Sequence, residues 1–368
     1  MRPRYFRIVS ILLIGISILF IACSDNSTDT SRRTTDRLFY ISSRFSEQIA
    51  CFNADREKFE SYIVPDTFGY VYDAIGNNES LVIRALNYDC LILDLDSNKY
   101  VHNLGPAASV DVSPNSHYVS LLKYIDGPTG GYDPYISPES RFTLEVRGVP
   151  DYGLVHLDTD VANCCFGPES RYLAYTHTVQ FGHNGNVLVV YDLITETTLE
   201  EGYKRFPFEI KIEKAIPIES KNKVVFHGTG DGDHLVCISD IGSPTMKILK
   251  QIPDLYFDPY SADIAVSPDG ERMYIVIIPA SGYAPQEQII YVYNTETELP
   301  AQNIDLESKG FQPHKMIITP DGKYMMAVAV DYAPDEIILI DLESGDVVFE
   351  YPQQGHQGFI AATLRDKN

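Results

Sequence analysis

The sequence predicts an all-β protein built from seven copies of one four-stranded antiparallel unit, the pattern of a seven-bladed β-propeller. Three observations support this. Residues 313–351 contain four short apolar runs, each bounded by turn-forming residues. Two marks of this segment recur about every 48 residues along the chain. The chain also has 25 Tyr and 17 Phe but no Trp, and aromatic residues favour strands.

The two repeated marks lie at fixed places in the unit. The first is a Ser/Thr/Gly-Pro turn between the first and second runs, at 113–116, 167–170, 267–270 and 319–322, with weaker versions at 76–79 and 216–219. The second is an acidic or amide residue that closes the third run, where its side chain can accept hydrogen bonds from the next backbone amides. We therefore expect a structural role for Asn53, Asp94, Glu145, Asp192, Asp240, Asn294 and Asp341.

The two ends of the repeat region complement each other. The first copy has only three runs, at 38–42, 48–53 and 59–64, and it lacks the run that should precede its turn. After the seventh copy, residues 358–364 remain and align with 314–320. We expect this C-terminal strand to complete the first blade and close the ring, which removes open sheet edges. The irregular stretch 206–218 leaves six or eight blades as alternatives.

Two blocks carry a family resemblance. Residues 267–274, Ser-Pro-Asp-Gly-Glu-Arg-Met-Tyr, and the Pro313-His-Lys and Thr319-Pro-Asp-Gly-Lys motifs resemble YVTN-type and WD40-like bacterial propellers. The resemblance spans about residues 37–366 and is sharpest in the last two copies. It implies the fold but not one function, because these families include binding proteins, lactonases and dehydrogenase subunits.

Residues 1–22 predict a lipoprotein signal peptide. Three arginines precede an apolar run at 8–22 that is short for a membrane-spanning helix. The run ends Leu-Phe-Ile-Ala-Cys23, which resembles a bacterial lipobox and implies cleavage before Cys23 and lipidation of that residue. An uncleaved N-terminal anchor is the alternative. Both place the chain outside the cytoplasm, in the bacterial cell envelope and tethered to its membrane.

The remaining chain divides into a tether and a domain. Residues 23–36 are polar after the lipidated cysteine and predict a flexible linker, so the propeller occupies 37–368. A formal charge of −22 argues against nucleic acid as a partner. No P-loop, H-E-x-x-H or G-x-S-x-G sequence occurs, and we predict no cofactor. The other cysteines match no zinc pattern, and we expect buried thiols at Cys51, Cys90, Cys164, Cys165 and Cys237.

The connections between the second and third runs contain the unusual residues. In a propeller these connections share one face, and tyrosine gives such a face contact area at low entropy cost. We therefore predict a binding or scaffold module for a protein, peptide or glycan; a purely structural platform in an envelope complex is the other possibility. Asp231-Gly-Asp233 lacks the third spaced carboxylate and the closing Glu of a calcium loop. The predicted binding face comprises Tyr132, Asp133, Tyr135, His183, Asp231, Asp233, His234, Tyr283 and Tyr332.

A second candidate site is the central channel, which the first runs would line. In the resembled families a Pro-His at the position of His314 points into the channel, which makes this histidine the candidate catalytic residue. A histidine with carboxylates can act as an acid–base pair or bind a cation, so the alternative function is a lactonase-like hydrolase. A polar channel with a satisfied histidine is the structural alternative. The predicted channel residues are Asp111, Glu213, Asp263, His314 and His356.

Overall fold

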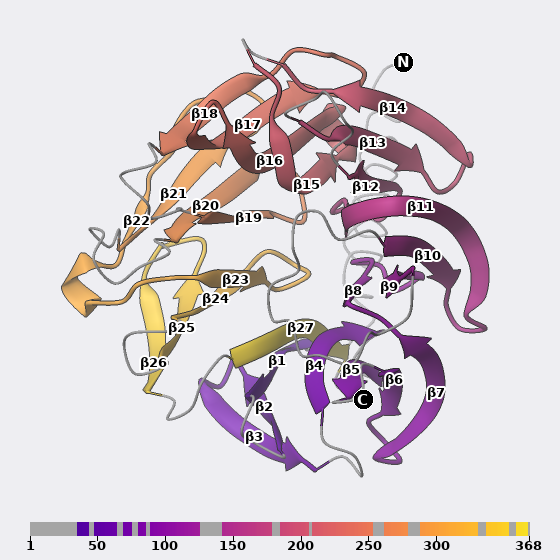
Figure 1. Ribbon diagram of the computed structural model, residues 1–368. Helices are drawn as coiled ribbons and strands as arrows, with labels where there is room; N and C mark the ends of the chain where they lie inside the picture. The colour runs from indigo at the N-terminus through magenta and orange to yellow at the C-terminus, as the bar shows by residue number, and fades with distance from the viewer. Residues whose placement is uncertain are drawn as a thin grey trace, which may run out of the picture. The chain divides into compact units, whose positions relative to one another are not determined.

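The computed structural model confirms an all-β fold (Figure 1). It describes residues 35–43, 48–64, 69–75, 80–85, 89–125, 142–178, 185–205, 208–252, 261–278, 288–329, 336–352 and 358–366. Within these ranges the chain forms antiparallel sheets and two short 3-10 turns, Glu219–Lys221 and Glu307–Lys309. The described part of the chain contains no helix long and apolar enough to cross a membrane.

The first sheet joins the two ends of the domain. It consists of β1 (Thr35–Ser43), β2 (Ile49–Asn53), β3 (Lys58–Ile63) and the C-terminal β27 (Gly358–Asp366), in the order β27-β1-β2-β3. Figure 1 shows β27, in yellow, alongside β1. The prediction that the C-terminal segment supplies the strand missing from the first copy is therefore confirmed.

Four further sheets have four strands each, in simple chain order. Neighbouring strands pair antiparallel, as expected where short apolar runs alternate with turns. These sheets contain β4 (Gly69–Ile75), β5 (Ser80–Ala85), β6 (Asp89–Asp94) and β7 (Lys99–Pro106); β15 (Lys211–Ile218), β16 (Lys223–Gly230), β17 (Asp233–Asp240) and β18 (Lys247–Ile252); β19 (Ser261–Val266), β20 (Arg272–Ile278), β21 (Ile289–Asn294) and β22 (Ile304–Asp305); and β23 (Lys315–Ile318), β24 (Tyr324–Val328), β25 (Glu336–Asp341) and β26 (Val347–Pro352).

The third and fourth predicted units form a single seven-stranded sheet. Its order is β14-β13-β12-β11-β10-β9-β8. The 14-residue β11 pairs with β10 through its first half and with β12 through its second half. A register shift and the positive φ of Asp160 (59°) mark the join. One strand thus serves both units, and the described chain has six sheets. The strands are β8 (Ser109–Val112), β9 (Tyr118–Tyr124), β10 (Phe142–Gly148), β11 (Gly153–Phe166), β12 (Tyr172–His177), β13 (Val187–Asp192) and β14 (Thr197–Tyr203).

The core consists of apolar clusters in which neighbouring four-stranded units face each other. One cluster combines β5–β7 residues with Val119 and Leu121 of β9, and another combines β16 and β17 residues with Ile264 and Ile275 of the next sheet. A further cluster packs the first sheet against the last, and in it the rings of Phe52 and Phe349 lie 4.5 Å apart. Middle strands such as β17 and β24 are buried almost continuously, which shows that both faces of these sheets pack against neighbours.

Most of the predicted strand-closing residues have the expected role. The side-chain oxygens of Asn53, Asp94, Asp192, Asn294 and Asp341 accept hydrogen bonds from amides two or three residues later. The prediction for Glu145 is wrong, because β10 continues to Gly148 and Glu145 forms ion pairs with Lys123 and Arg147 instead. At Asp240 the backbone oxygen, rather than the carboxylate, accepts the turn hydrogen bond from Ser243.

Removing β27 should destabilise the whole domain. A chain ending at Gln357 would expose the edge of β1 and remove Ala362 from the cluster between the first and last sheets. We expect the melting temperature to fall by about 10 °C or more, or the protein to aggregate. The control is a chain that lacks only residues 367–368, which follow β27. Equal thermal unfolding of both truncated chains would contradict the role of β27.

Candidate functional site

Side chains on the first strands, and in the first sheet on the second strand β1, bond directly to the first strand of the next unit. In four cases a hydroxyl or carboxylate oxygen accepts a backbone N–H across the gap, joining β1 to β4, β4 to β8, β8 to β11 and β19 to β23. The donor and acceptor pairs are Val71 to Ser42 (3.0 Å), Val112 to Asp73 (3.2 Å), Phe166 to Asp111 (3.2 Å) and Met316 to Asp263 (3.2 Å). We call these bonds the inner-strand contacts.

Donor side chains make the remaining inner-strand contacts that the described residues show. Asn163 of β11 donates to the carbonyl of Ile212 in β15 (3.3 Å). Lys214 of β15 donates to the carbonyl of Ile264 (2.9 Å) and forms an ion pair with Asp263 (2.7 Å). Although burial opposes it, the Asp263 carboxylate raises the pKa of Lys214. This ammonium therefore stays charged and bridges β15 to β19.

These contacts give two of the predicted channel residues a structural role. Asp111 and Asp263 lie on first strands as expected, but their carboxylates hold the next strand. Burial raises the pKa of Asp111 despite the amide hydrogen bond that it accepts. A carboxylate engaged in this way is poorly placed to activate water. Their role as acid–base candidates is therefore not supported by their geometry.

A cavity of about 820 Å³ lies against the first strands. Residues of β4, β8, β11, β15, β19, β23 and β27 line it, together with the turns between first and second strands. Its charged lining includes Asp73 and Lys214, which both make inner-strand contacts. The repeated turn motif surrounds one end of the cavity through Pro114, Pro168, Pro268 and Pro320.

Two other predicted channel residues, His314 and Glu213, do not line this cavity. His314 is half-buried, and its backbone N–H bonds to the carbonyl of Val328 (2.8 Å), but it is absent from the cavity lining. His356 lies outside the described residues. Glu213 does not line the cavity either, since its neighbour Lys214 takes that position. Glu213 instead belongs to a second polar cluster.

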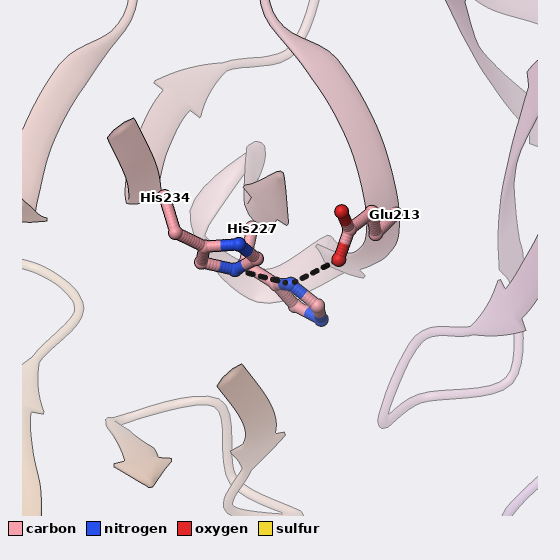
Figure 2. Close-up of side chains that lie close together, drawn as sticks. All are labelled: Glu213, His227 and His234. Carbon is pink, nitrogen blue, oxygen red and sulfur yellow. Dashed lines mark hydrogen bonds and ion pairs between the residues drawn. The ribbon is translucent and has the colours of Figure 1, made fainter. Parts of the chain in front are cut away.

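The second cluster contains Glu213 of β15, His227 of β16 and His234 of β17 (Figure 2). His227 Nδ1 lies 3.1 Å from His234 Nε2 and 3.7 Å from Glu213 Oε2. All three potential ligand atoms lie within 4.8 Å of one another. His227 and His234 are buried, whereas the Glu213 side chain is 36% exposed. The cluster is therefore closed on the histidine side and open to solvent at the carboxylate.

The β16–β17 hairpin places both histidines on one face. Its turn is Asp231-Gly232, with φ values of 53° and 87°, as the two central positions of a type I′ turn require. The register pairs Thr229 with His234, and His227 is two residues before Thr229 on the same face. His227 and His234 are therefore diagonal cross-strand neighbours within side-chain reach.

A β-bulge in β15 adds the carboxylate. The pairing passes from Ile212–Gly228 to Lys214–His227, so Glu213 is the extra residue. The strands approach closely here: a Cβ atom on Gly228 would lie 2.0 Å from the carbonyl oxygen of Lys211. Glycine is therefore required beside the bulge. The bulge lets Glu213 face His227 while Lys214 faces the cavity.

Burial controls the protonation of the cluster. It lowers the pKa of His227 well below its usual range, with smaller contributions from His234 and Lys214. It also lowers the pKa of His234 to about 4. Both imidazoles are thus neutral near pH 7, which is the form that binds metal ions. Burial raises the pKa of Glu213, an effect that Lys211 partly offsets.

The predicted binding face is only partly described. Tyr132, Asp133, Tyr135, His183, Tyr283 and Tyr332 lie outside the described residues. Asp231 is the first central residue of the hairpin turn, and Asp233 follows the turn and accepts a hydrogen bond from Gln251. His234 is not in a loop: it is 3% exposed within β17, because the connection is a two-residue turn rather than an insertion. Sequence reasoning missed His227, although two histidines around an Asp-Gly turn were a usable signal.

The five cysteines within the described residues form no disulfide. Cys51, Cys90 and Cys237 are buried, as predicted, whereas Cys164 and Cys165 are half-buried. Burial raises the pKa of the Cys90, Cys164 and Cys237 thiols to about 12. These thiols are therefore poor nucleophiles and metal ligands.

Comparisons with known proteins support the fold but not a family. No protein-family model and no curated protein matches the sequence. Among solved structures, dihydro-heme d1 dehydrogenase NirN in complex with DHE has a TM-score of 0.56 at 13% identity, over 87% of this chain and 74% of that chain. A functionally unknown protein from Desulfotomaculum acetoxidans has a TM-score of 0.53 at 12% identity, over 90% of this chain and 99% of that chain. Hydrazine synthase from Kuenenia stuttgartiensis has a TM-score of 0.52 at 11% identity, over 85% of this chain and 92% of that chain.

Similarity at these identities shows the fold alone. The chain is an all-β protein of antiparallel sheets with propeller-like structural neighbours.

Replacing Asp263 by Ala should reduce stability. The change removes the acceptor of the Met316 amide and the partner of Lys214 at once. We expect the free energy of unfolding, measured in urea, to fall by about 2–3 kcal/mol. Asp96→Ala, in an exposed turn, is the control and should change stability little. A fully stable Asp263→Ala protein would show that the inner-strand contacts are not structural.

His234→Gln should reduce the acid sensitivity of the fold. The folded-state pKa of about 4 lies below the ordinary value, so the unfolded chain binds more protons and stability falls as pH drops below about 6.5. The free energy of unfolding, measured in urea with a chelator present, should fall between pH 7 and pH 5 in both proteins. The fall should be about 2 kcal/mol smaller in the variant than in wild type. His227, Glu213 and Lys214 face the site in both proteins. The exposed His102→Gln should behave as wild type; an unchanged pH slope in His234→Gln would contradict the shift.

Proposed function

We propose that the chain is a seven-bladed propeller that acts as a binding or scaffold module for a protein, peptide or glycan. Counting the halves of β11 as the outer strand of the third blade and the inner strand of the fourth gives seven units. The cluster between the first and last sheets supports closure of the ring, as does the ion pair of Arg37 in β1 with Asp321 in the last sheet. The repeated Pro-containing turns favour a relation to YVTN-type and WD40-like propellers.

The observation that carries the functional proposal is the position of the insertions. The segments 125–141, 178–186, 279–288 and 329–335 join β9 to β10, β12 to β13, β20 to β21 and β24 to β25. Each is the connection between the second and third strands of its unit. In a propeller these connections share one face, and loops carried by a rigid scaffold are the usual place for recognition.

The residue types in these insertions suit a binding surface. Tyr132, Tyr135, Tyr283 and Tyr332 can each bury a broad ring while the hydroxyl stays hydrated. The cavity at the Pro-containing turns lies at the other end of the strands, and two of its charged groups are engaged in inner-strand contacts. We therefore assign recognition to the insertion face rather than to the cavity.

The proposed location is the cell envelope. Lipidation of Cys23 would tether the domain to the membrane through residues 23–36, which leaves the insertion face free to meet a partner. The negative charge disfavours docking to anionic lipid, so the acyl chains would supply the membrane affinity. The lactonase-like alternative has less support, because Asp111 and Asp263 hold neighbouring strands and His314 does not line the cavity.

Replacing Tyr132, Tyr135 and Tyr283 together by Ala should abolish partner recovery. The immobilised full-length protein would be exposed to solubilised envelope proteins and to a glycan panel, with quantitative mass spectrometry and fluorescence as readouts. We expect at least about a tenfold loss of the wild-type partner with an unchanged melting temperature, because hot-spot aromatics carry much of the binding energy.

Two controls make this experiment decisive. Replacing Val101 and Leu154 by Ala removes exposed apolar side chains from outer strands and should not affect recovery. Replacing His117 and Glu169 by Ala changes the cavity lining. Loss of binding in the cavity variant but not in the tyrosine variant would refute the insertion face as the binding site.

A further inference from the structure

The Glu213–His227–His234 cluster has the composition of a metal site. Two neutral imidazoles and one carboxylate are a ligand set used for zinc, with a remaining position for water or another ligand. We infer that Glu213 Oε2, His227 Nδ1 and His234 Nε2 bind one divalent transition-metal ion, with Zn²⁺ as the representative ion. This inference does not depend on the identity of any partner.

The distances fit a small cation. Zn–N and Zn–O bonds of about 2.0–2.2 Å in tetrahedral geometry separate two ligand atoms by about 3.3–3.5 Å. The two observed separations are 3.1 Å between the histidine nitrogens and 3.7 Å between His227 and Glu213. The third pair, Glu213 and His234, lies within 4.8 Å, so side-chain rotations would bring all three atoms to bonding distance. In Figure 2 the three side chains converge from three different strands.

The histidine pair is poorly satisfied as a purely structural feature. His234 Nδ1 is buried and has no hydrogen-bond partner among the described residues. Its Nε2 faces another imidazole, and only one of the two facing nitrogens can carry the proton of a neutral pair. Buried polar atoms without partners destabilise a fold unless another interaction compensates. A cation that accepts the lone pairs of His227 Nδ1 and His234 Nε2 would remove the competition of these two nitrogens for one proton, whereas His234 Nδ1 is not among its ligands.

The electrostatic setting also permits a cation. Lys211 and Lys214 are nearby positive groups, and the charge of Lys214 is paired with Asp263. Glu213 contributes one negative charge and its side chain is 36% exposed, which gives an ion access from solvent. The β-bulge and the tight hairpin hold the ligands on rigid strands.

Zinc titration of the full-length, chelator-treated protein without a histidine tag tests the inference. We expect one equivalent of Zn²⁺ by calorimetry, and a Co²⁺ complex with the intense visible absorption of four-coordinate sites. Glu213→Gln should weaken Zn²⁺ binding more than about tenfold, since loss of an outer-shell partner alone often costs that much. Zinc should raise the melting temperature of wild type but not of the variant.

Controls separate this site from adventitious binding and from misfolding. His102→Gln and His117→Gln alter exposed histidines outside the cluster and should bind Zn²⁺ as wild type does. His227→Gln and His234→Gln should abolish stoichiometric binding. If these buried substitutions unfold the protein, Glu213→Gln and Glu213→Ala still decide the question, because that side chain is partly exposed. Less than stoichiometric binding by wild type, or unchanged affinity in the Glu213 variants, overturns the inference.

Discussion

The architecture depends on hydrogen bonds that cross from one first strand to the next. The first strands β4, β8, β19 and β23 are edges of their sheets, so some of their N–H groups have no strand partner. Asp73, Asp111 and Asp263 accept hydrogen bonds from amides of the following unit, and the Asp263 carboxylate, which is ion-paired with Lys214, is a charged acceptor of the stronger kind. The same requirement explains why acidic residues recur on first strands in an apolar environment. It also explains why these carboxylates serve the scaffold rather than chemistry.

Strand β15 combines the scaffold and the candidate metal site in adjacent residues. Lys214 faces the cavity and bridges to Asp263, whereas Glu213 faces the histidines. Neighbouring side chains on a regular strand also point to opposite faces. At the bulge, however, Glu213 is the extra residue, and the direction of both side chains changes. A local departure from ideal pairing at this position therefore creates a polar cluster without interrupting the inner-strand contacts.

The sequence predicted the repeat, most strand-closing residues and the place of the C-terminal strand, because these follow from local periodicity and turn chemistry. The predictions from the sequence were wrong where strand pairing determines the position of a residue. Glu145 matched the pattern, yet β10 continued past it; His234 was assigned to a loop because the Asp-Gly turn was not used to set the register. Glu213 and His227 are 14 positions apart, and only the bulge brings them together. The inner-strand contacts join residues of different units, which no local pattern reveals.

The shared strand β11 has a consequence for how the domain comes apart. Its first half completes one unit and its second half begins the next, with no intervening loop to absorb movement. Separating those two units would require breaking backbone pairing rather than sliding apolar surfaces. Residues 109–203 should therefore behave as one cooperative block in hydrogen exchange, whereas units linked by connections can open singly. The units of the repeat therefore differ in how independently each one can open.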